Sequence, residues 1–284
     1  MTKENISSAE MTAHWRCQYP AISGDSLSTK LASHDGVQKA LEFEEKYQYP
    51  LIGRKISVRA GWCLEQTTQM LIRGNYDSCI SLGSGFSLLT YYAALATHQK
   101  KKIHFFDADL TGMIRVRRER IKQLPKNTLN SAVSEKIETV EIDLEKAFRQ
   151  GEKFSDLFPS DCQAPVFVIE GLIYFLSENC VRWIFAGIAE YKNAGVVFDY
   201  WPEGSEKSSE CFKRVLSTLK DFIPEKVQGL LNEAQLKKLV GTHLTQDVNL
   251  KDIEHNYAKQ NQESAQLIDQ NDFIPVQLAT AEWG

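Results

Sequence analysis

A short apolar run that ends in two closely spaced glycines constrains the fold of this chain most. Cys79 to Leu82 has the length and composition of a buried strand, and Gly83-Ser84-Gly85 follows it directly. Leu88 to Ala96 then has the pattern of a helix. A strand, a glycine turn and a helix in this order leave backbone amides free at the helix N-terminus and let a ligand approach the main chain closely. The segment therefore predicts a nucleotide-binding crevice, although Gly-x-Gly alone is also common in ordinary tight turns.

Further strands and helices alternate along the chain after this crevice. The additional apolar runs of strand length are Ile103–Phe106, Ile137–Ile142, Pro165–Ile169 and Val196–Phe198. Alternation of this kind is typical of an α/β fold with a parallel sheet. Most of the runs are nearly all apolar, as expected for strands that are covered on both faces. Ile137–Ile142 alternates apolar and polar residues, so we expect it nearer an edge of the sheet.

The two ends of the chain have different patterns. The first 75 residues contain helical stretches without strands and predict a helical cap packed beside the sheet. Residues 205–240 are mostly helical and polar, with an interruption near Pro224. Leu244–Leu250 and Phe273–Leu278 are apolar and predict an antiparallel hairpin at the sheet edge. We therefore expect one domain, 1–284, composed of a helical cap (1–75), a cofactor-binding core (76–204) and a helical insertion with edge strands (205–284).

The composition argues against several classes of function. Hydrophobic residues make up 43% of the chain and charged residues 25%, as in an ordinary globular protein. The net charge of −4 gives no electrostatic footprint for nucleic acid, and we expect the basic runs Lys100–Lys102 and Arg115–Arg120 on the surface. No apolar run approaches the roughly 20 residues of a membrane span. The N-terminus lacks a signal-peptide pattern, and the six cysteines lack metal-site spacing. We expect a cytoplasmic protein without a metal, a nucleic-acid partner or a membrane partner.

The residues around the glycines discriminate between cofactors. A dinucleotide fingerprint has a third small residue where this chain has Leu88, and no Lys-Ser or Lys-Thr of a phosphate loop follows the glycines. The crevice therefore favours a nucleoside without a phosphate chain, of which S-adenosylmethionine is the common one. Such a ligand needs an acid for the ribose hydroxyls, available as Asp109 or Asp107, and a polar group for the adenine amine, available as Asp143. The plainer alternative is that these acids cap the helices that follow them.

Six segments carry a more specific pattern in a fixed order. They are Ser28-Thr29-Lys30, Pro50–Arg54 with Arg59, Leu82–Gly85, Asp107-Ala108-Asp109 with Arg117–Ile121, Asp143-Leu144, and Glu170-Gly171-Leu172-Ile173-Tyr174-Phe175-Leu176. In order and spacing they resemble the leucine carboxyl methyltransferase family, which includes bacterial O-methyltransferases of polyketide and related natural-product pathways. The resemblance runs over about residues 25 to 200, and the segment from Glu170 is its most specific part.

The resemblance implies a Rossmann-like class I methyltransferase fold, with a mostly parallel seven-stranded sheet, and S-adenosyl-L-methionine as the cofactor. It also implies a binding role for each matching residue: the methionine carboxylate for Lys30 and Arg59, the methionine moiety for Gly83, the ribose for Asp109, the adenine for Asp143 and Leu144, and the methionine amine for Glu170. Plainer alternatives remain for several of them. Lys30 could be a surface lysine, Arg59 an ordinary pairing partner on a helix surface, and Asp143 the cap of the helix that follows it.

Methyl transfer from a sulfonium is an in-line displacement that depends on positioning and on the exclusion of water. A carboxylate acceptor needs no base, whereas a hydroxyl acceptor needs one within hydrogen-bond reach. Tyr174, Asp199 and Tyr200 are candidates, but no motif distinguishes among them and we assign no catalytic residue. Trp62, Tyr174 and Trp201 are candidates for the wall of an apolar acceptor pocket, or for ordinary core packing.

The leading hypothesis is therefore an S-adenosylmethionine-dependent O-methyltransferase that acts on a hydroxyl or carboxylate of a small molecule, for example a natural-product intermediate. One alternative is a carboxyl methyltransferase that acts on a protein C-terminus. Another is a non-catalytic relative that keeps the fold as a binding module. A nicotinamide dehydrogenase is a distant third, disfavoured by Leu88. The sequence carries no expectation about the oligomeric state.

Overall fold

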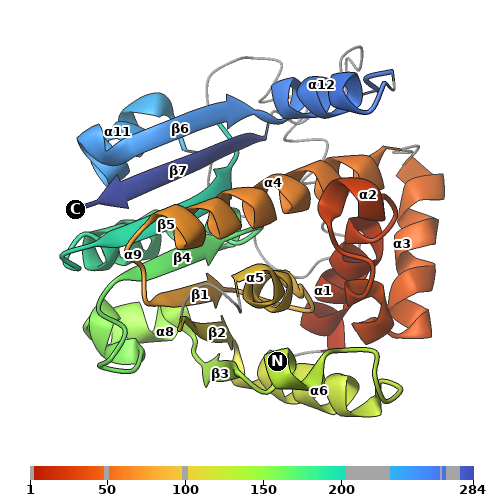
Figure 1. The fold of residues 1–284 in the computed structure, drawn as a ribbon, viewed down its shortest axis with the longest axis horizontal. Helices are drawn as coiled ribbons and strands as arrows, with labels where there is room; N and C mark the ends of the chain where they lie inside the picture. The colour runs from red at the N-terminus through yellow and green to blue at the C-terminus, as the bar shows by residue number, and fades with distance from the viewer. Residues whose placement is uncertain (1–2, 48–50, 98–101, 203–230, 263, 267–275) are drawn as a thin grey trace.

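A seven-stranded sheet in the order β3-β2-β1-β4-β5-β7-β6 forms the centre of the computed structural model (Figure 1). The structure describes residues 3–47, 51–97, 102–202, 231–262, 264–266 and 276–284. The strands are β1 (Ser78–Leu82), β2 (His104–Asp109), β3 (Ile137–Glu141), β4 (Pro165–Ile169), β5 (Ala194–Tyr200), β6 (Leu244–Asn249) and β7 (Gln277–Trp283). Strands β1 to β5 pair in parallel, and β7 is antiparallel to both of its neighbours. The predicted α/β fold with a mostly parallel sheet is confirmed.

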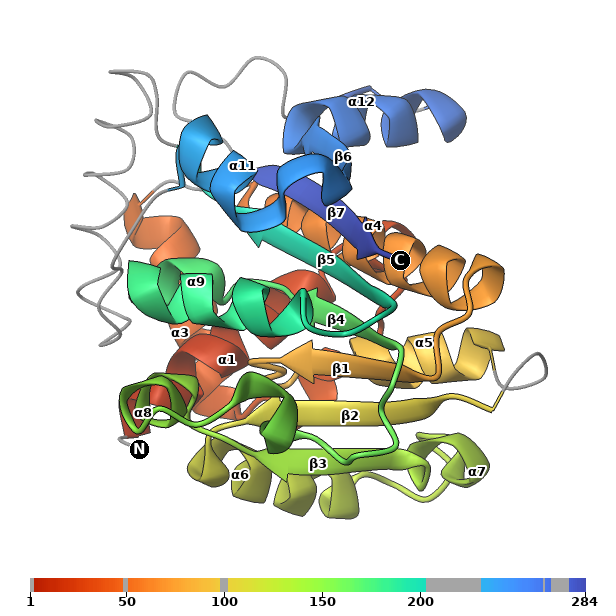
Figure 2. The same ribbon diagram turned by 90° about the vertical axis from the view of Figure 1, so that its left-hand side faces the viewer.

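Helices cover both faces of the sheet, because successive side chains of a strand point to opposite faces. In β4, Phe167 and Ile169 join an apolar cluster with α8 (Leu144–Arg149), α9 (Glu178–Ile188) and α11 (Glu233–Val240). Val166 and Val168 join a second cluster with α4 (Ile52–Arg73), α5 (Leu89–Thr97) and α12 (Leu250–Gln260). Figure 2 shows α8 and α9 in front of the strands and α4 and α5 behind them. The other described helices that follow β1 are α6 (Thr111–Gln123) and α7 (Ser131–Ser134), with single 3₁₀ turns at Phe154–Leu157, Ile173–Phe175 and Gly241–His243.

The edges of the sheet follow the sequence pattern in part. The alternating strand β3 is half-exposed and lies at one edge, as predicted. Strands β6 and β7 pair antiparallel, also as predicted, but α12 lies between them in the chain, so they do not form a tight hairpin. The last strand begins at Gln277 and not at Phe273, and residues 273–275 lie outside the described part. Its small residues, such as Ala279 and Ala281, have a weak strand signal and are extended because β5 and β6 flank them.

The predicted cap, 1–75, also included α4, but α4 packs along one face of the sheet. The helices that precede α4 lie beyond the carboxyl ends of the parallel strands and form a cap there (Figures 1 and 2). They are α1 (Lys3–Arg16), α2 (Pro20–Ser23), a 3₁₀ turn η1 (Ser28–Leu31) and α3 (His34–Tyr47). The cap has a small core of its own, in which Trp15 packs edge-on against Phe43 with ring centroids 5.4 Å apart. Of the predicted helical stretch 205–240, residues 205–230 lie outside the described part, and α11 occupies the end. None of the described helices combines the length and apolar character that a membrane crossing requires.

Candidate functional site

The loop after β1 turns as the two glycines predict. Gly83 has φ of 66° and Gly85 has φ of 50°, both in the left-handed region that favours glycine. A Cβ on Gly83 would lie 3.0 Å from the Leu172 side chain, so this side chain, which follows β4, packs closely against the Gly83 backbone. The amides of Gly83 and Ser84 both donate to the Ala108 carbonyl of β2, at 2.8 and 3.2 Å. The loop is thereby tied to the sheet, with its glycines at the wall of a cavity.

This cavity has a volume of about 540 Å³ and lies between the carboxyl ends of the strands and the cap. Its size is within the range of about 300–1,000 Å³ that is usual for small-molecule sites. The structure brings most of the sequence-predicted site residues to its wall: Arg59, Gly83, Asp109, Asp143, Leu144 and Glu170. They come from α4 and from the ends of β1, β2, β3 and β4, which are far apart in the sequence. Within the described part of the chain, no group of three or more His, Cys, Asp or Glu residues is placed to hold a metal ion.

Lys30 is the predicted residue that the structure does not bring to the cavity. Its side chain is exposed and is not part of the cavity wall. Because a 3₁₀ turn has three residues per turn, Ser28 and Leu31 share one side of η1 and are buried there. Lys30 consequently faces away from the protein interior, which agrees with the plainer surface alternative.

Asp109, at the end of β2, lies in the wall with both carboxylate oxygens occupied by backbone amides. Oδ2 accepts from the Gly85 amide and Oδ1 from the Leu110 amide, each at 2.7 Å. Burial raises the pKa of Asp109, and the two amide hydrogen bonds only partly oppose that rise. The carboxylate therefore holds the glycine loop in place while presenting an acid to the cavity.

Asp107 has a different role from Asp109, which the sequence left open. It is 2% exposed, does not line the cavity, and accepts hydrogen bonds from Thr90 Oγ1 (2.8 Å) and Arg117 Nη2 (2.6 Å). Arg117 also donates through Nη1 to the Gly85 carbonyl at 2.8 Å. The prediction that the whole basic run of α6 lies on the surface was therefore wrong for Arg117, because its guanidinium neutralises a buried acid.

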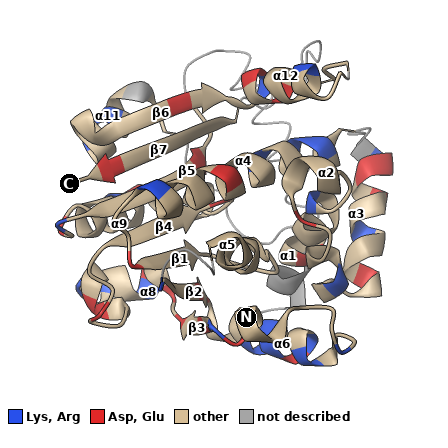
Figure 3. Ribbon diagram, in the orientation of Figure 1, with Lys and Arg blue, Asp and Glu red and all other residues tan. Residues whose placement is uncertain are grey.

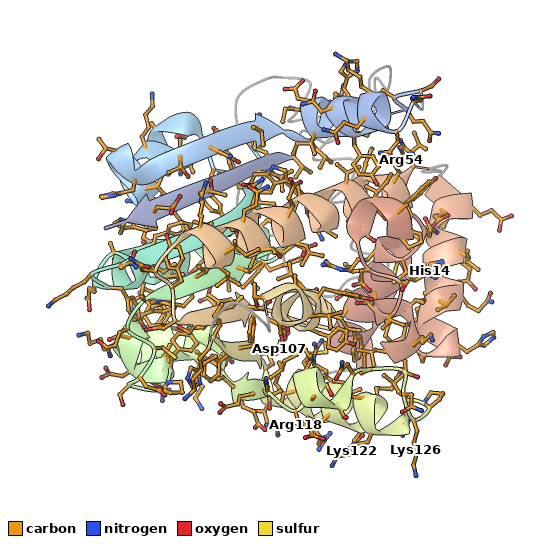
Figure 4. All side chains as sticks on the ribbon, viewed as in Figure 1. His14, Arg54, Asp107, Arg118, Lys122 and Lys126 are labelled. Carbon is orange, nitrogen blue, oxygen red and sulfur yellow. The ribbon has the colours of Figure 1, made fainter. Side chains whose placement is uncertain are left out.

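Other basic residues of α6 and of the loop after it do point outward. Lys and Arg positions gather along this helix in Figure 3. In Figure 4, Arg118, Lys122 and Lys126 project from the molecule, whereas Asp107 lies inside it. Arg118 forms an exposed pair with Glu141 at 2.9 Å. Pairs of this kind contribute little to stability.

Asp143 follows β3 and is the N-cap of α8, where Oδ1 accepts from the Lys146 amide at 2.9 Å. The helix-capping alternative is thus confirmed. The same side chain lines the cavity, and its Oδ2 has no partner in the described structure. Leu144, the first residue of α8, is 7% exposed and presents an apolar surface beside it.

Glu170, just after β4, is held by two arginines from the N-terminal helices. Arg16 Nη1 donates to both carboxylate oxygens, at 2.8 and 2.7 Å, and Arg59 Nε donates to Oε1 at 3.2 Å. Burial disfavours the charged form, but the two guanidinium groups outweigh it and keep the pKa of Glu170 below its ordinary value. Sequence reasoning missed Arg16, because it precedes the segments that carry the resemblance. A single arginine in the last turn of a helix is an ordinary feature.

Arg59 also contacts the opposite side of the site. Its Nη1 donates to the Tyr174 hydroxyl at 3.0 Å and lies 3.5 Å from Asp199 Oδ2. Asp199 is fully buried, and its Oδ1 accepts from the Gly171 amide at 2.6 Å. Burial raises the pKa of Asp199, and Arg59 offsets this only in part. Arg59 is therefore a buried partner of several groups and not an ordinary helix-surface residue.

The three candidate bases occupy different environments. Asp199 does not line the cavity, and the Tyr200 hydroxyl donates to Asp247 of β6 at 3.0 Å, away from it. Tyr174 lines the cavity, but burial and the nearby acids raise the pKa of its hydroxyl, so it remains protonated near neutral pH. Its ring stacks on Trp201 with centroids 4.3 Å apart and planes 14° apart. Both rings belong to the cavity wall, whereas Trp62 is a core residue outside it.

Two buried polar atoms of wall residues have no hydrogen-bond partner in the described structure: Arg16 Nη2 and Ser84 Oγ. Arg59 donates its hydrogen bonds through Nε and Nη1, so Nη2 is available to a ligand. An unsatisfied buried donor costs about 1–3 kcal/mol, which a suitably placed ligand oxygen recovers. Arg59 Nη2 and the Glu170 carboxylate suit the carboxylate and ammonium of an amino-acid group, and the acids of β2 and β3 suit a nucleoside.

Comparison with known proteins gives results for both sequence and fold. The model of a family described as leucine carboxyl methyltransferase matches residues 8–189, more than half of the chain. No curated protein sequence matches significantly. A DUF574 family protein from Streptomyces avermitilis has a similar structure, with a TM-score of 0.60, 11% identity, and coverage of 98% of this chain and 97% of its own. A protein from Thermobifida fusca YX, provisionally described as a methyltransferase, is also similar in structure, with a TM-score of 0.61, 9% identity and coverage of 94% of each chain. At these identities the two structures support the fold alone.

Proposed function

We propose that this chain, which belongs to the leucine carboxyl methyltransferase family and is therefore an S-adenosylmethionine-dependent methyltransferase, transfers the methyl group to an oxygen of a small-molecule acceptor. The observation that carries the proposal is the cavity itself. The wall of one cavity joins the acids that follow β2, β3 and β4 to the stacked pair Tyr174–Trp201. A nucleoside and an apolar acceptor therefore have adjoining surfaces in one cavity.

In the proposed cofactor site, the polar groups divide by chemistry. Arg59 Nη2 is assigned to the methionine carboxylate and Glu170 to the ammonium, since each then meets the opposite charge. Each Asp109 oxygen keeps a lone pair for the ribose hydroxyls beyond the amide that it already accepts. Asp143 Oδ2 is assigned to the adenine amine, Leu144 to the adenine face, and Gly83 to the methionine moiety. Lys30 has no part in this assignment, because its side chain lies outside the cavity.

The cofactor supplies an activated methyl group on sulfur. The protein has to hold the acceptor oxygen in line with it and exclude water. Tyr174 and Trp201 offer a flat apolar surface for the body of the acceptor. The Tyr174 hydroxyl accepts from Arg59 and donates to Asp199 Oδ2 at 3.5 Å, and because it stays protonated it is a poor base. An acceptor that is already ionised, such as a carboxylate or an acidic phenol, suits these residues best. The cytoplasmic location expected from the sequence remains a prediction.

Titration of the purified chain with S-adenosylhomocysteine tests the cofactor site. We expect micromolar binding that is lost in Arg59→Ala and Glu170→Ala and unchanged in Lys30→Ala, the exposed control. Absence of binding by the wild type contradicts the assignment, and binding of NAD in its place favours a dehydrogenase. Transfer of a labelled methyl group to a panel of aromatic carboxylates, phenols and a peptide with a free C-terminus then tests the acceptor. Binding without transfer to any of them favours the non-catalytic binding module.

A further inference from the structure

Arg16 connects parts of the site that no local sequence motif links. It is the last residue of α1 and is 2% exposed. Its Nε donates to Asp25 Oδ2 at 2.8 Å, and its Nη1 donates to both oxygens of Glu170. One buried guanidinium thus joins a carboxylate of the cap to a carboxylate at the end of β4.

The connection continues from Asp25 toward the glycine loop. Asp25 Oδ1 accepts from the amides of Leu27 and Ser28, both at 3.0 Å, and Oδ2 also accepts from the Ser28 hydroxyl. Ser28 Oγ in turn accepts from the Leu88 amide at 3.0 Å, just before α5. Burial opposes ionisation of Asp25, but Arg16 and these donors keep its pKa below the ordinary value. Asp25 is therefore a charged, fixed anchor for Arg16.

We propose that Arg16 is a positioning residue that fixes the Glu170 carboxylate for recognition of the amino-acid end of the cofactor. This inference rests on the proposed function, since it assumes that S-adenosylmethionine occupies the cavity. Arg16 contacts Glu170 more closely than Arg59 does, at 2.7 Å against 3.2 Å, and it reaches both oxygens. Arg59 is shared with Tyr174 and Asp199, so it cannot fix the orientation of Glu170 alone.

The dependence on Arg16 follows from the charges around Glu170. Loss of Arg16 leaves a carboxylate with an 8% exposed side chain beside one shared guanidinium. Such a carboxylate turns toward Arg59 or takes up a proton, and in either case it presents less negative charge to an ammonium group. On the adenosine side, Asp109 and Asp143 accept hydrogen bonds from backbone amides and not from Arg16, so we expect binding there to be unaffected.

A pair of ligands separates positioning from general structural damage. S-adenosylhomocysteine carries the amino-acid group, whereas 5′-methylthioadenosine has the same adenosine and thioether without it. For Arg16→Gln we expect the affinity for S-adenosylhomocysteine to fall about 10- to 100-fold, the range for hydrogen bonds to charged groups. The affinity for 5′-methylthioadenosine should stay within about twofold of wild type. The readout is calorimetric binding, which needs no turnover.

Arg54→Gln is the matched control. Arg54 Nε forms a buried ion pair with Glu254 Oε1 of α12 at 2.7 Å, and neither residue lines the cavity. Its loss should lower stability and leave the ratio of the two affinities unchanged. The double variant Arg16→Gln/Glu170→Gln should bind S-adenosylhomocysteine no more weakly than Glu170→Gln alone, because Arg16 acts through Glu170. If Arg16→Gln does not fold, Arg16→Lys replaces it. A lysine keeps the positive charge but lacks the several N–H donors of the planar guanidinium, so we expect the same selective loss of affinity for S-adenosylhomocysteine.

An equal loss of affinity for both ligands in Arg16→Gln or Arg16→Lys overturns the inference but does not contradict the cofactor assignment. Additive losses in the double variant also overturn it. If the wild type binds neither ligand, the cofactor assignment itself fails and the inference with it. A loss confined to S-adenosylhomocysteine, absent in Arg54→Gln, supports the positioning role.

Discussion

Arg16 and Glu170 are 154 positions apart in the chain and meet in a buried ion pair, with Arg16 Nη1 2.7 Å from Glu170 Oε2. One residue ends the first helix of the cap, and the other follows the central strand β4. The contact makes the cap a wall of the site rather than an independent addition. In the proposed cofactor site, the same charged groups would contribute both to the stability of the fold and to cofactor binding.

Neutralising Glu170 is expected to lower stability. In Glu170→Gln, Arg16 and Arg59 lose a shared anion inside the protein, and removal of one partner from a buried pair typically costs about 3–5 kcal/mol. Urea unfolding measures the change. Glu178→Gln is the control, because its pair with Arg182 is exposed and should give little change. Equal unfolding midpoints for the two variants would contradict a structural role for the buried cluster.

The same carboxylate is expected to make stability depend on pH. Because Glu170 has a pKa below the ordinary value of 4.5 in the folded protein, its contribution is fully present above pH 4.5 and is lost as the pH falls through the folded-state pKa. Asp25 contributes in the same direction below its ordinary value of 3.8. Unfolding free energies measured between pH 7 and 3 should fall more steeply in wild type than in Glu170→Gln. Parallel pH profiles would show that the arginines do not hold the carboxylate ionised.

The sheet and the strand-end residues were predictable because their signals are local. Apolar runs, glycines and the acids that follow them lie within a few residues of one another, and the sheet gathers those ends at one edge. This reasoning found Asp109, Asp143 and Glu170 at the cavity wall. It also anticipated the exposed edge strand β3 from its alternation.

The cap side of the site was less predictable, because its contacts join distant segments. Arg16 and Arg117 look like ordinary helix charges in the sequence, yet each is buried against an acid from another element. Lys30 belongs to a recognisable motif but lies on the outward side of its 3₁₀ turn. Which charged residue of a helix faces inward depends on the acid that meets it, and that acid comes from elsewhere in the fold.

Asp109→Asn is expected to weaken the adenosine side of the site. An asparagine has one oxygen in place of two, so either the Gly85 or the Leu110 amide loses its acceptor. We expect about a 10-fold or greater loss of affinity for both S-adenosylhomocysteine and 5′-methylthioadenosine. Lys30→Ala should bind both as wild type does. A loss limited to S-adenosylhomocysteine would place Asp109 at the amino-acid end and contradict its assignment to the ribose.

The two glycines of the loop should differ in their tolerance of a side chain. Both have positive φ, so alanine at either position carries a backbone cost of about 1–2 kcal/mol. At Gly83 the new Cβ would also meet Leu172 at 3.0 Å, whereas at Gly85 the nearest atom is Ala9 Cβ at 3.5 Å, an ordinary contact. Gly83→Ala should therefore unfold at a lower urea concentration than Gly85→Ala. The reverse order would mean that the Leu172 side chain moves aside easily and that backbone strain alone determines the loss of stability.

Trp201 is expected to determine acceptor binding without affecting the cofactor. Its indole forms one wall of the cavity and supports the Tyr174 ring by stacking at 4.3 Å. In Trp201→Leu, loss of this flat surface should raise the KM of an acceptor found in the panel by about 10-fold or more, while the Kd of S-adenosylhomocysteine stays within about twofold. Trp62→Phe, a change in the core outside the cavity, is the control and should alter neither constant. If Trp201→Leu weakens S-adenosylhomocysteine binding and leaves the acceptor KM unchanged, the aromatic pair contacts the nucleoside. The acceptor then has to bind against another part of the cavity wall.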